Sequence, residues 1–176
     1  MLKLYAEPYE LLHRPVQPFD FNTLDPAKIT QEMIEVMENY NGIGLAANQV
    51  GLDARIFVMG SNKIDGFCNP QAFINPIITK YSMEDSVDKE GCLSFPTLFL
   101  NVKRPKMIEA TYYDIAGNQQ EIRVTGYMAK CFQHEYDHLN GICFTNRVSK
   151  LKLEMSLKKL KDRKSTRLNS SHIPLS

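Results

Sequence analysis

The sequence predicts an α+β domain in which antiparallel sheets pack around a central helix. Three observations support this fold class: a helix-start signal near the amino end, alternating strands in the middle, and a histidine-bearing helix after them. Helices that are segregated from a run of antiparallel strands are typical of this class. The 176 residues, of which 43% are hydrophobic, suit one domain with a sizeable core.

The N-terminal helix is expected to begin at Asp25-Pro26 and to stop at Asn41-Gly42. Aspartate is a favourable N-cap, and proline is tolerated at the first helical position because its missing N–H has no helical partner there. Apolar side chains recur between these ends at helical spacing, which predicts one buried face: Ile29, Met33, Val36, Met37 and Tyr40.

Strands are expected next, over residues 55–59 and 73–78, followed by a hairpin that pairs 107–113 with 120–124. The hairpin is favoured by the turn-forming residues between its two strands. Pro76 interrupts the second strand, and proline cannot donate a hydrogen bond to a strand neighbour. That strand is therefore expected at a sheet edge.

The next helix carries an HExxH motif between His134 and His138. Histidines at i and i+4 lie on the same helix face, so both imidazoles can bind one metal ion. Glu135 then lies beside the first ligand, where it can reach a water on the metal as a general base. The motif predicts metal-assisted hydrolysis.

The alternative explanation of the motif is a chance pair of solvated histidines. The helical stripe that contains them argues against this, because it also contains apolar neighbours and should point inward. Buried imidazoles need polar partners, and a metal ion supplies one to both. The stripe comprises Tyr127, Cys131, His134, His138 and Gly141.

The chain ends in a lysine-rich amphipathic segment and a polar tail. Residues 150–161 predict a short C-terminal helix, and one domain is expected over residues 1–161. Residues 162–176 have no apolar periodicity and look like a translated sequencing-adapter oligonucleotide. A non-native or disordered tail is expected there.

The third metal ligand has to come from outside the motif. Zinc peptidases of this type use a downstream histidine or glutamate, but Phe144 stands where that histidine would be. Glu154 lies in the lysine-rich segment, where pairing with lysine is expected. Cys92 is the better candidate, because a thiolate is a good ligand for Zn²⁺ or Fe²⁺. Cys68 and Cys143 are expected to be buried structural residues.

Three segments resemble the signatures of the peptide deformylase family, in the same order. They are residues 42–49 (GIGLAANQ), 90–94 (EGCLS) and 133–141 (QHEYDHLNG). The resemblance covers roughly residues 2–161 and implies one catalytic domain there. It implies a hydrolase that removes the formyl group from an N-terminal formylmethionine and releases formate.

The resemblance also implies the site residues. One divalent metal ion is expected on Cys92, His134 and His138, Fe²⁺ natively, with Zn²⁺, Ni²⁺ and Co²⁺ as alternatives. Glu135 is expected as the general base, and the Gln49 side chain and the backbone N–H of Leu93 as oxyanion donors. The substrate-binding residues are expected to be Ile43, Gly44, Glu90, Tyr127 and Cys131.

Three departures from the family pattern concern substrate binding. Tyr127 stands where the family usually has a small or aliphatic residue, and Lys130 stands where some members have an aliphatic side chain. Residues 97–100 are apolar, whereas many members carry an arginine nearby. An HExxH metallopeptidase and an inactive binder of formylated chain ends remain as alternative functions. The missing peptidase ligand disfavours the first, and the intact Glu135 and Gln49 disfavour the second.

Charge, hydropathy and cysteine content limit which partners and which cellular compartment can be expected. A net charge of +1 gives no electrostatic reason to expect nucleic acid or a membrane surface, and no apolar run is long enough to span a bilayer. The four widely spaced cysteines indicate a reducing compartment. The expected protein is a cytoplasmic monomer, bacterial or phage-encoded, that acts on nascent formylmethionyl polypeptides at the ribosome.

Overall fold

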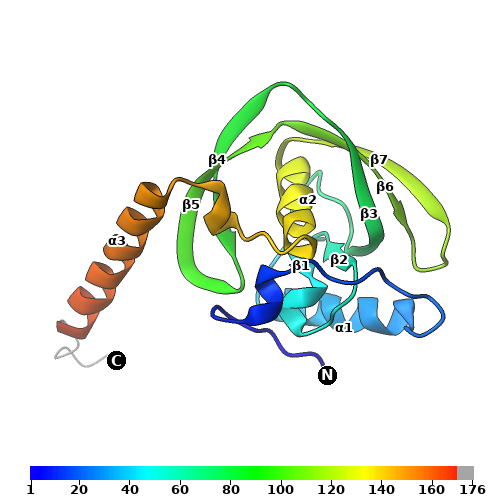
Figure 1. Cartoon of the computed structure of the whole chain (residues 1–176), viewed down its shortest axis with the longest axis horizontal. Coiled ribbons are helices and arrows are strands. Elements are labelled where there is room, and N and C mark those ends of the chain that lie inside the picture. Colours follow the sequence, from blue (N-terminus) through cyan, green and yellow to red (C-terminus); the bar gives the residue numbers. More distant parts are fainter. Residues whose placement is uncertain (170–176) are drawn as a thin grey trace.

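One helix, α2 (Gly126–Leu139), crosses the middle of the molecule, and two antiparallel sheets lie around it (Figure 1). The structure is a computed structural model and describes residues 1–169. The five-stranded sheet has the order β1-β2-β3-β6-β7, and β4 and β5 form a two-stranded sheet. This arrangement confirms the predicted α+β class. The strands are β1 (Gly44–Ala46), β2 (Ile56–Met59), β3 (Gln71–Tyr81), β4 (Asp85–Cys92), β5 (Phe95–Pro105), β6 (Met107–Tyr113) and β7 (Gln119–Thr125).

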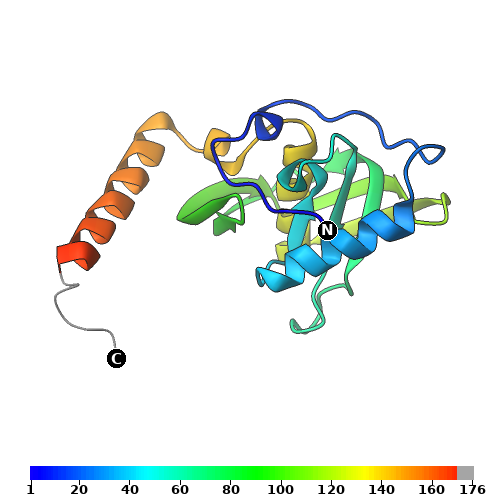
Figure 2. The same ribbon diagram turned by 90° about the horizontal axis from the view of Figure 1, so that it is seen from below.

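The large sheet lies between two helices, α1 (Pro26–Asn39) and α2 (Figure 2). Successive side chains of a strand point to opposite faces, and β2 is buried on both. Phe57 packs toward α2, with its ring centroid 4.9 Å from that of Phe132. Its neighbours Ile56 and Val58 belong to the cluster that holds Met37 of α1. The sheet thus separates two clusters of the core, and one of its faces packs against α2.

The predicted start of α1 is confirmed. The Asp25 side chain accepts a hydrogen bond from the backbone N–H of Lys28 at 3.1 Å, and Pro26 is the first helical residue. The helix ends at Asn39, and the N–H of Gly42 donates to the carbonyl of Met37 at 2.8 Å. The helix therefore delivers the chain directly into the glycine-containing segment before β1.

The prediction that the Pro76 strand lies at a sheet edge is wrong. β3 lies between β2 and β6 in the sheet, but its ladder with β2 covers only Gln71–Ile74 and does not reach Pro76. On the β6 side, a register shift separates Ile74 from Ile77, and Asn75 has a φ of 47°. Pro76 therefore belongs to neither ladder, so a strand inside the sheet tolerates it. The β6–β7 hairpin was predicted correctly.

The last helix, α3 (Lys150–Asn169), extends away from the body of the molecule (Figures 1 and 2). Its Leu153 and Leu160 pack against a cluster that contains Phe144 and Leu100 of β5. The helix continues past the expected end at residue 161, and residues 170–176 of the expected tail lie outside the described residues. Three short 3₁₀ helices complete the described chain: Glu10–His13, Ala47–Val50 and Phe144–Arg147.

Within residues 1–169, each helix is either too short or too polar to span a membrane.

We expect deletion of residues 162–176 to leave activity and melting temperature unchanged, because Leu153 and Leu160 both precede the deletion. As a matched control, Leu160→Ala should lower the melting temperature by roughly 2–4 °C per kcal/mol of packing energy lost. Thermal denaturation of both variants tests this. A loss of several degrees in the deletion variant would show that its residues stabilise the fold.

Candidate active site

The site is built where β4 and α2 lie side by side. Inward residues recur every second position on a strand and every fourth on a helix. Two strand residues rise about 6.6 Å and four helical residues rise about 6 Å, so the two series stay in register over several contacts. We call the resulting contacts the three β4–α2 pairs: Asp88 with Lys130, Glu90 with His134, and Cys92 with His138.

The metal ligands predicted from the sequence converge. Among the described residues, Cys92, His134 and His138 each offer a ligand atom, and these atoms all lie within 4.8 Å of one another. Cys92 Sγ lies 3.3 Å from His138 Nε2. Both histidines are buried. One thiolate and two imidazoles form a donor set that suits a divalent transition metal with an open coordination position.

Glu90 fixes the orientation of the first histidine. Its Oε2 lies 3.0 Å from His134 Nδ1, which leaves Nε2 to face the ligand cluster. Burial opposes the charged form of Glu90, but hydrogen bonds with His134 and Arg104 lower its pKa overall. The carboxylate is therefore ionised, and it fixes the orientation of the His134 ring.

The two histidines have opposite pKa shifts. Burial lowers the pKa of His138 well below its usual value, and the neighbouring His134 adds to this effect. Burial also lowers the pKa of His134, but hydrogen bonds with Cys92 and Glu90 outweigh it and raise the pKa well above its usual value. The neutral His138 ring keeps a lone pair for a metal ion.

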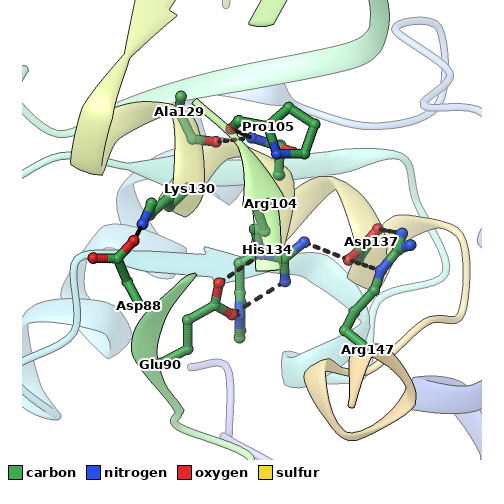
Figure 3. Close-up of polar contacts among 10 residues, drawn as sticks. Asp88, Glu90, Arg104, Pro105, Ala129, Lys130, His134, Asp137 and Arg147 are labelled. Carbon is green, nitrogen blue, oxygen red and sulfur yellow. Dashed lines mark hydrogen bonds and ion pairs between the residues drawn. The ribbon is translucent and has the colours of Figure 1, made fainter. Parts of the chain in front are cut away.

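A buried arginine of β5, Arg104, bridges carboxylates of β4 and α2 (Figure 3). Arg104 of β5 donates to both Glu90 oxygens, at 2.5 and 3.1 Å, and to Asp137 at 2.8 Å. Arg147 donates twice to the same Asp137, at 2.6 and 2.9 Å. This network of ion pairs was not predicted from the sequence. A signal was present, because Arg104 continues the alternating buried positions Leu98, Leu100 and Val102 of β5.

Glu135 places a buried carboxylate beside His134 in the same helix. It is buried, and its Oε2 has no hydrogen-bond partner among the described residues. Burial raises the pKa of Glu135 to about 7. A Cβ atom on Gly44 would lie 2.6 Å from Glu135 Oε1, so glycine is required for this close approach. A carboxylate with this pKa can exchange protons near neutral pH.

The Gln49 amide is held in one orientation. Its Oε1 accepts from the backbone N–H of Ala46 at 2.9 Å. Its Nε2 faces Ser94 Oγ at 3.1 Å and Cys92 Sγ at 3.6 Å. The Ser94 hydroxyl donates to the Tyr5 carbonyl at 2.7 Å and so keeps a lone pair for the amide. The amide donor therefore points toward the ligand cluster.

One cavity of about 700 Å³ opens onto this site. It brings together the five substrate-binding residues predicted from the sequence, together with Gln49, Leu93 and Glu135. Cys131 lines the cavity and lies outside the ligand cluster, and burial raises its pKa well above that of an ordinary thiol. Tyr127, which was expected to be buried with the helical stripe, lines the cavity but is 57% exposed.

The residues considered as other ligands lie elsewhere. Glu154 is exposed on α3. Cys143 is fully buried, and burial raises its pKa to about 12. Cys68 is only partly buried, and all four cysteines of the chain are free.

Comparisons with known proteins agree with this geometry. The family model for polypeptide deformylase matches residues 1–154. The peptide deformylase of Thermotoga maritima is 43% identical over 149 residues, which make up 85% of this chain and 86% of that protein.

Solved structures extend the similarity to the fold. The peptide deformylase of Synechococcus elongatus in complex with actinonin has a TM-score of 0.82 and 34% identity, covering 90% of this chain and 85% of that one. The class I type b enzyme of Acinetobacter baumannii with Met-Ala-Ser bound has a TM-score of 0.79 and 30% identity, covering 84% and 98%. The chain therefore belongs to the polypeptide deformylase family, metal-dependent hydrolases that remove the N-formyl group from nascent polypeptides.

Proposed function

We propose that Cys92, His134 and His138 hold one divalent metal ion, Fe²⁺ natively, and that Glu135, Gln49 and Leu93 carry out deformylation beside it. The observation that carries the proposal is the convergence of the three ligand atoms next to a buried, unpartnered carboxylate oxygen within the described residues. A bound divalent ion lowers the pKa of a coordinated water and polarises a carbonyl oxygen.

Glu135 acts as the general base and then as the general acid. It accepts a proton from the water whose oxygen attacks the formyl carbon. When the carbon–nitrogen bond breaks, Glu135 returns that proton to the departing amine, and formate leaves. The raised pKa of Glu135 matches both halves of this transfer, because the group can take and release a proton near neutral pH.

Gln49 and Leu93 stabilise the negative charge that develops on the formyl oxygen. The Gln49 amide is already fixed by Ala46 and Ser94, so it needs little reorganisation during the reaction. The backbone N–H of Leu93 follows the ligand Cys92 directly in the chain and provides the second donor. Preorganised donors of this kind usually make a large contribution to catalysis.

The substrate is a polypeptide that begins with formylmethionine. Its first side chain enters the cavity between Ile43, Tyr127 and Cys131, and Glu90 and Gly44 line the same cavity. The Met-Ala-Ser ligand of the Acinetobacter baumannii relative supports a methionine pocket in this family. We place the enzyme in a bacterial cytoplasm, encoded by the bacterium or a phage, where it acts as a monomer on chains emerging from ribosomes.

We expect the protein to deformylate formyl-Met-Ala-Ser and to leave unformylated Met-Ala-Ser intact. Mass spectrometry of both reactions measures this directly. Internal cleavage of either peptide would indicate a metallopeptidase, and binding without turnover would indicate an inactive binder.

We expect Cys92→Ala to lose most bound metal and activity, because the thiolate is one of three ligands. Metal analysis after anaerobic purification should find about one iron in the parent protein and little in the variant. Cys68→Ala is the matched control and should keep its metal, since Cys68 lies outside the ligand cluster. Full metal occupancy in Cys92→Ala would refute the ligand assignment.

We expect Glu135→Ala and Gln49→Leu to retain metal but to lose turnover. Removal of a general base should cost about 10²–10⁴-fold in kcat. Removal of one oxyanion donor should cost about 10²–10³-fold. Steady-state kinetics and metal content are measured on the same samples. Near-parent turnover in either metal-loaded variant would exclude the role assigned to that residue.

A further inference from the structure

The outermost of the three β4–α2 pairs has no part in the chemistry above. Lys130 forms an ion pair with Asp88, and Figure 3 shows the two side chains pointing toward each other. The Lys130 side chain is only 9% exposed, whereas that of Asp88 is 50% exposed. A buried ammonium group needs a charged or polar partner, and Asp88 provides it from the solvent side.

This ion pair lies in the wall of the substrate cavity. Both residues line the cavity together with Glu90 and Cys131. Lys130 precedes His134 by one helical turn, about 6 Å along the axis, on the same face of α2. A long side chain that enters past His134 and Glu90 therefore meets the Lys130–Asp88 pair about one helical turn farther along the cavity wall.

We propose that the Asp88–Lys130 ion pair forms the polar end of the pocket for the first side chain of the substrate. There it selects side chains that carry a hydrogen-bond acceptor near the tip. The inference rests on the proposed function, because it assigns specificity to the same cavity. The proposed chemistry at the metal ligands and Glu135 does not require the Asp88–Lys130 ion pair.

Lys130 offers N–H donors and no acceptor. The thioether sulfur of methionine is a weak acceptor, and the oxygen of methionine sulfoxide is a strong one. Norleucine has a similar length and shape but no acceptor. Burying its terminal methyl group against the ion pair leaves the ammonium without a new partner. An apolar pocket would rank the three side chains differently, since it would accept norleucine and reject the sulfoxide.

The first experiment uses the parent protein and three formylated tripeptides that differ only in the first residue: methionine, norleucine and methionine sulfoxide, each followed by Ala-Ser. We expect kcat/KM for norleucine to be about two- to tenfold below that for methionine, the loss expected for one ordinary hydrogen bond, because the thioether sulfur is a weak acceptor. The sulfoxide should be processed within about tenfold of methionine by the same reasoning.

The second experiment replaces the ion pair by apolar residues of similar size in the double variant Lys130→Met, Asp88→Leu. The norleucine-to-methionine ratio of kcat/KM should rise about two- to tenfold, and the sulfoxide-to-methionine ratio should fall at least about tenfold, because the sulfoxide oxygen is the stronger acceptor. The matched control is Lys103→Met, Asp85→Leu. That pair lies on the same β4–β5 hairpin, with its charged atoms 3.4 Å apart, and lines no part of the cavity. Its ratios should equal those of the parent.

Each ratio is taken within one protein sample, so a loss of folded protein cancels. Unchanged ratios in the Lys130→Met, Asp88→Leu variant would overturn the inference and leave the pair as a structural contact between β4 and α2. If that variant does not fold, the parent ranking decides: equal use of norleucine and methionine with rejection of the sulfoxide overturns the inference. Absence of deformylation of the methionine peptide by the parent would instead refute the proposed function.

Discussion

The register between β4 and α2 is the constraint on which the site depends. The strand supplies a cysteine and an orienting carboxylate, and the helix supplies two histidines, at spacings that nearly match. A shift of β4 by one residue would turn Cys92 and Glu90 to the opposite face and remove both from the site. The β4–β5 hairpin fixes this register from one side, and the large sheet supports α2 from the other.

The ion pairs of Arg104 favour this register of β4 and α2 over shifted ones. Arg104 is 3% exposed and contacts carboxylates from β4 and α2 at once, while Arg147 supplies a second positive charge to Asp137. Burying such groups is costly unless every charge is paired and hydrogen-bonded. A displaced strand would leave Glu90 or Asp137 without its partner. The network therefore disfavours alternative registers and fixes the orientation of the His134 ring through Glu90.

Local signals predicted part of this structure correctly. The Asp25 cap, the β6–β7 hairpin and the HExxH helix each follow from neighbouring residues, and Cys92 followed from the failure of the peptidase ligands. Long-range pairing was harder to predict. Pro76 suggested an edge strand, because the sequence does not show that the β2 ladder ends at Ile74 and that the β6 register shifts before Ile77. Arg104 was missed because its two partners lie 14 and 33 residues away along the chain.

The most direct test of this account is the metal affinity of Glu90→Gln, measured by competition with a chelator of known affinity. The substitution leaves all three ligands in place and removes the negative charge that holds the His134 ring. We expect the metal dissociation constant to rise about 10–100-fold, as is typical when such an orienting partner is removed. Glu84→Gln, an exposed residue paired with Lys106, is the control and should bind metal like the parent. An unchanged dissociation constant in folded Glu90→Gln would contradict the account.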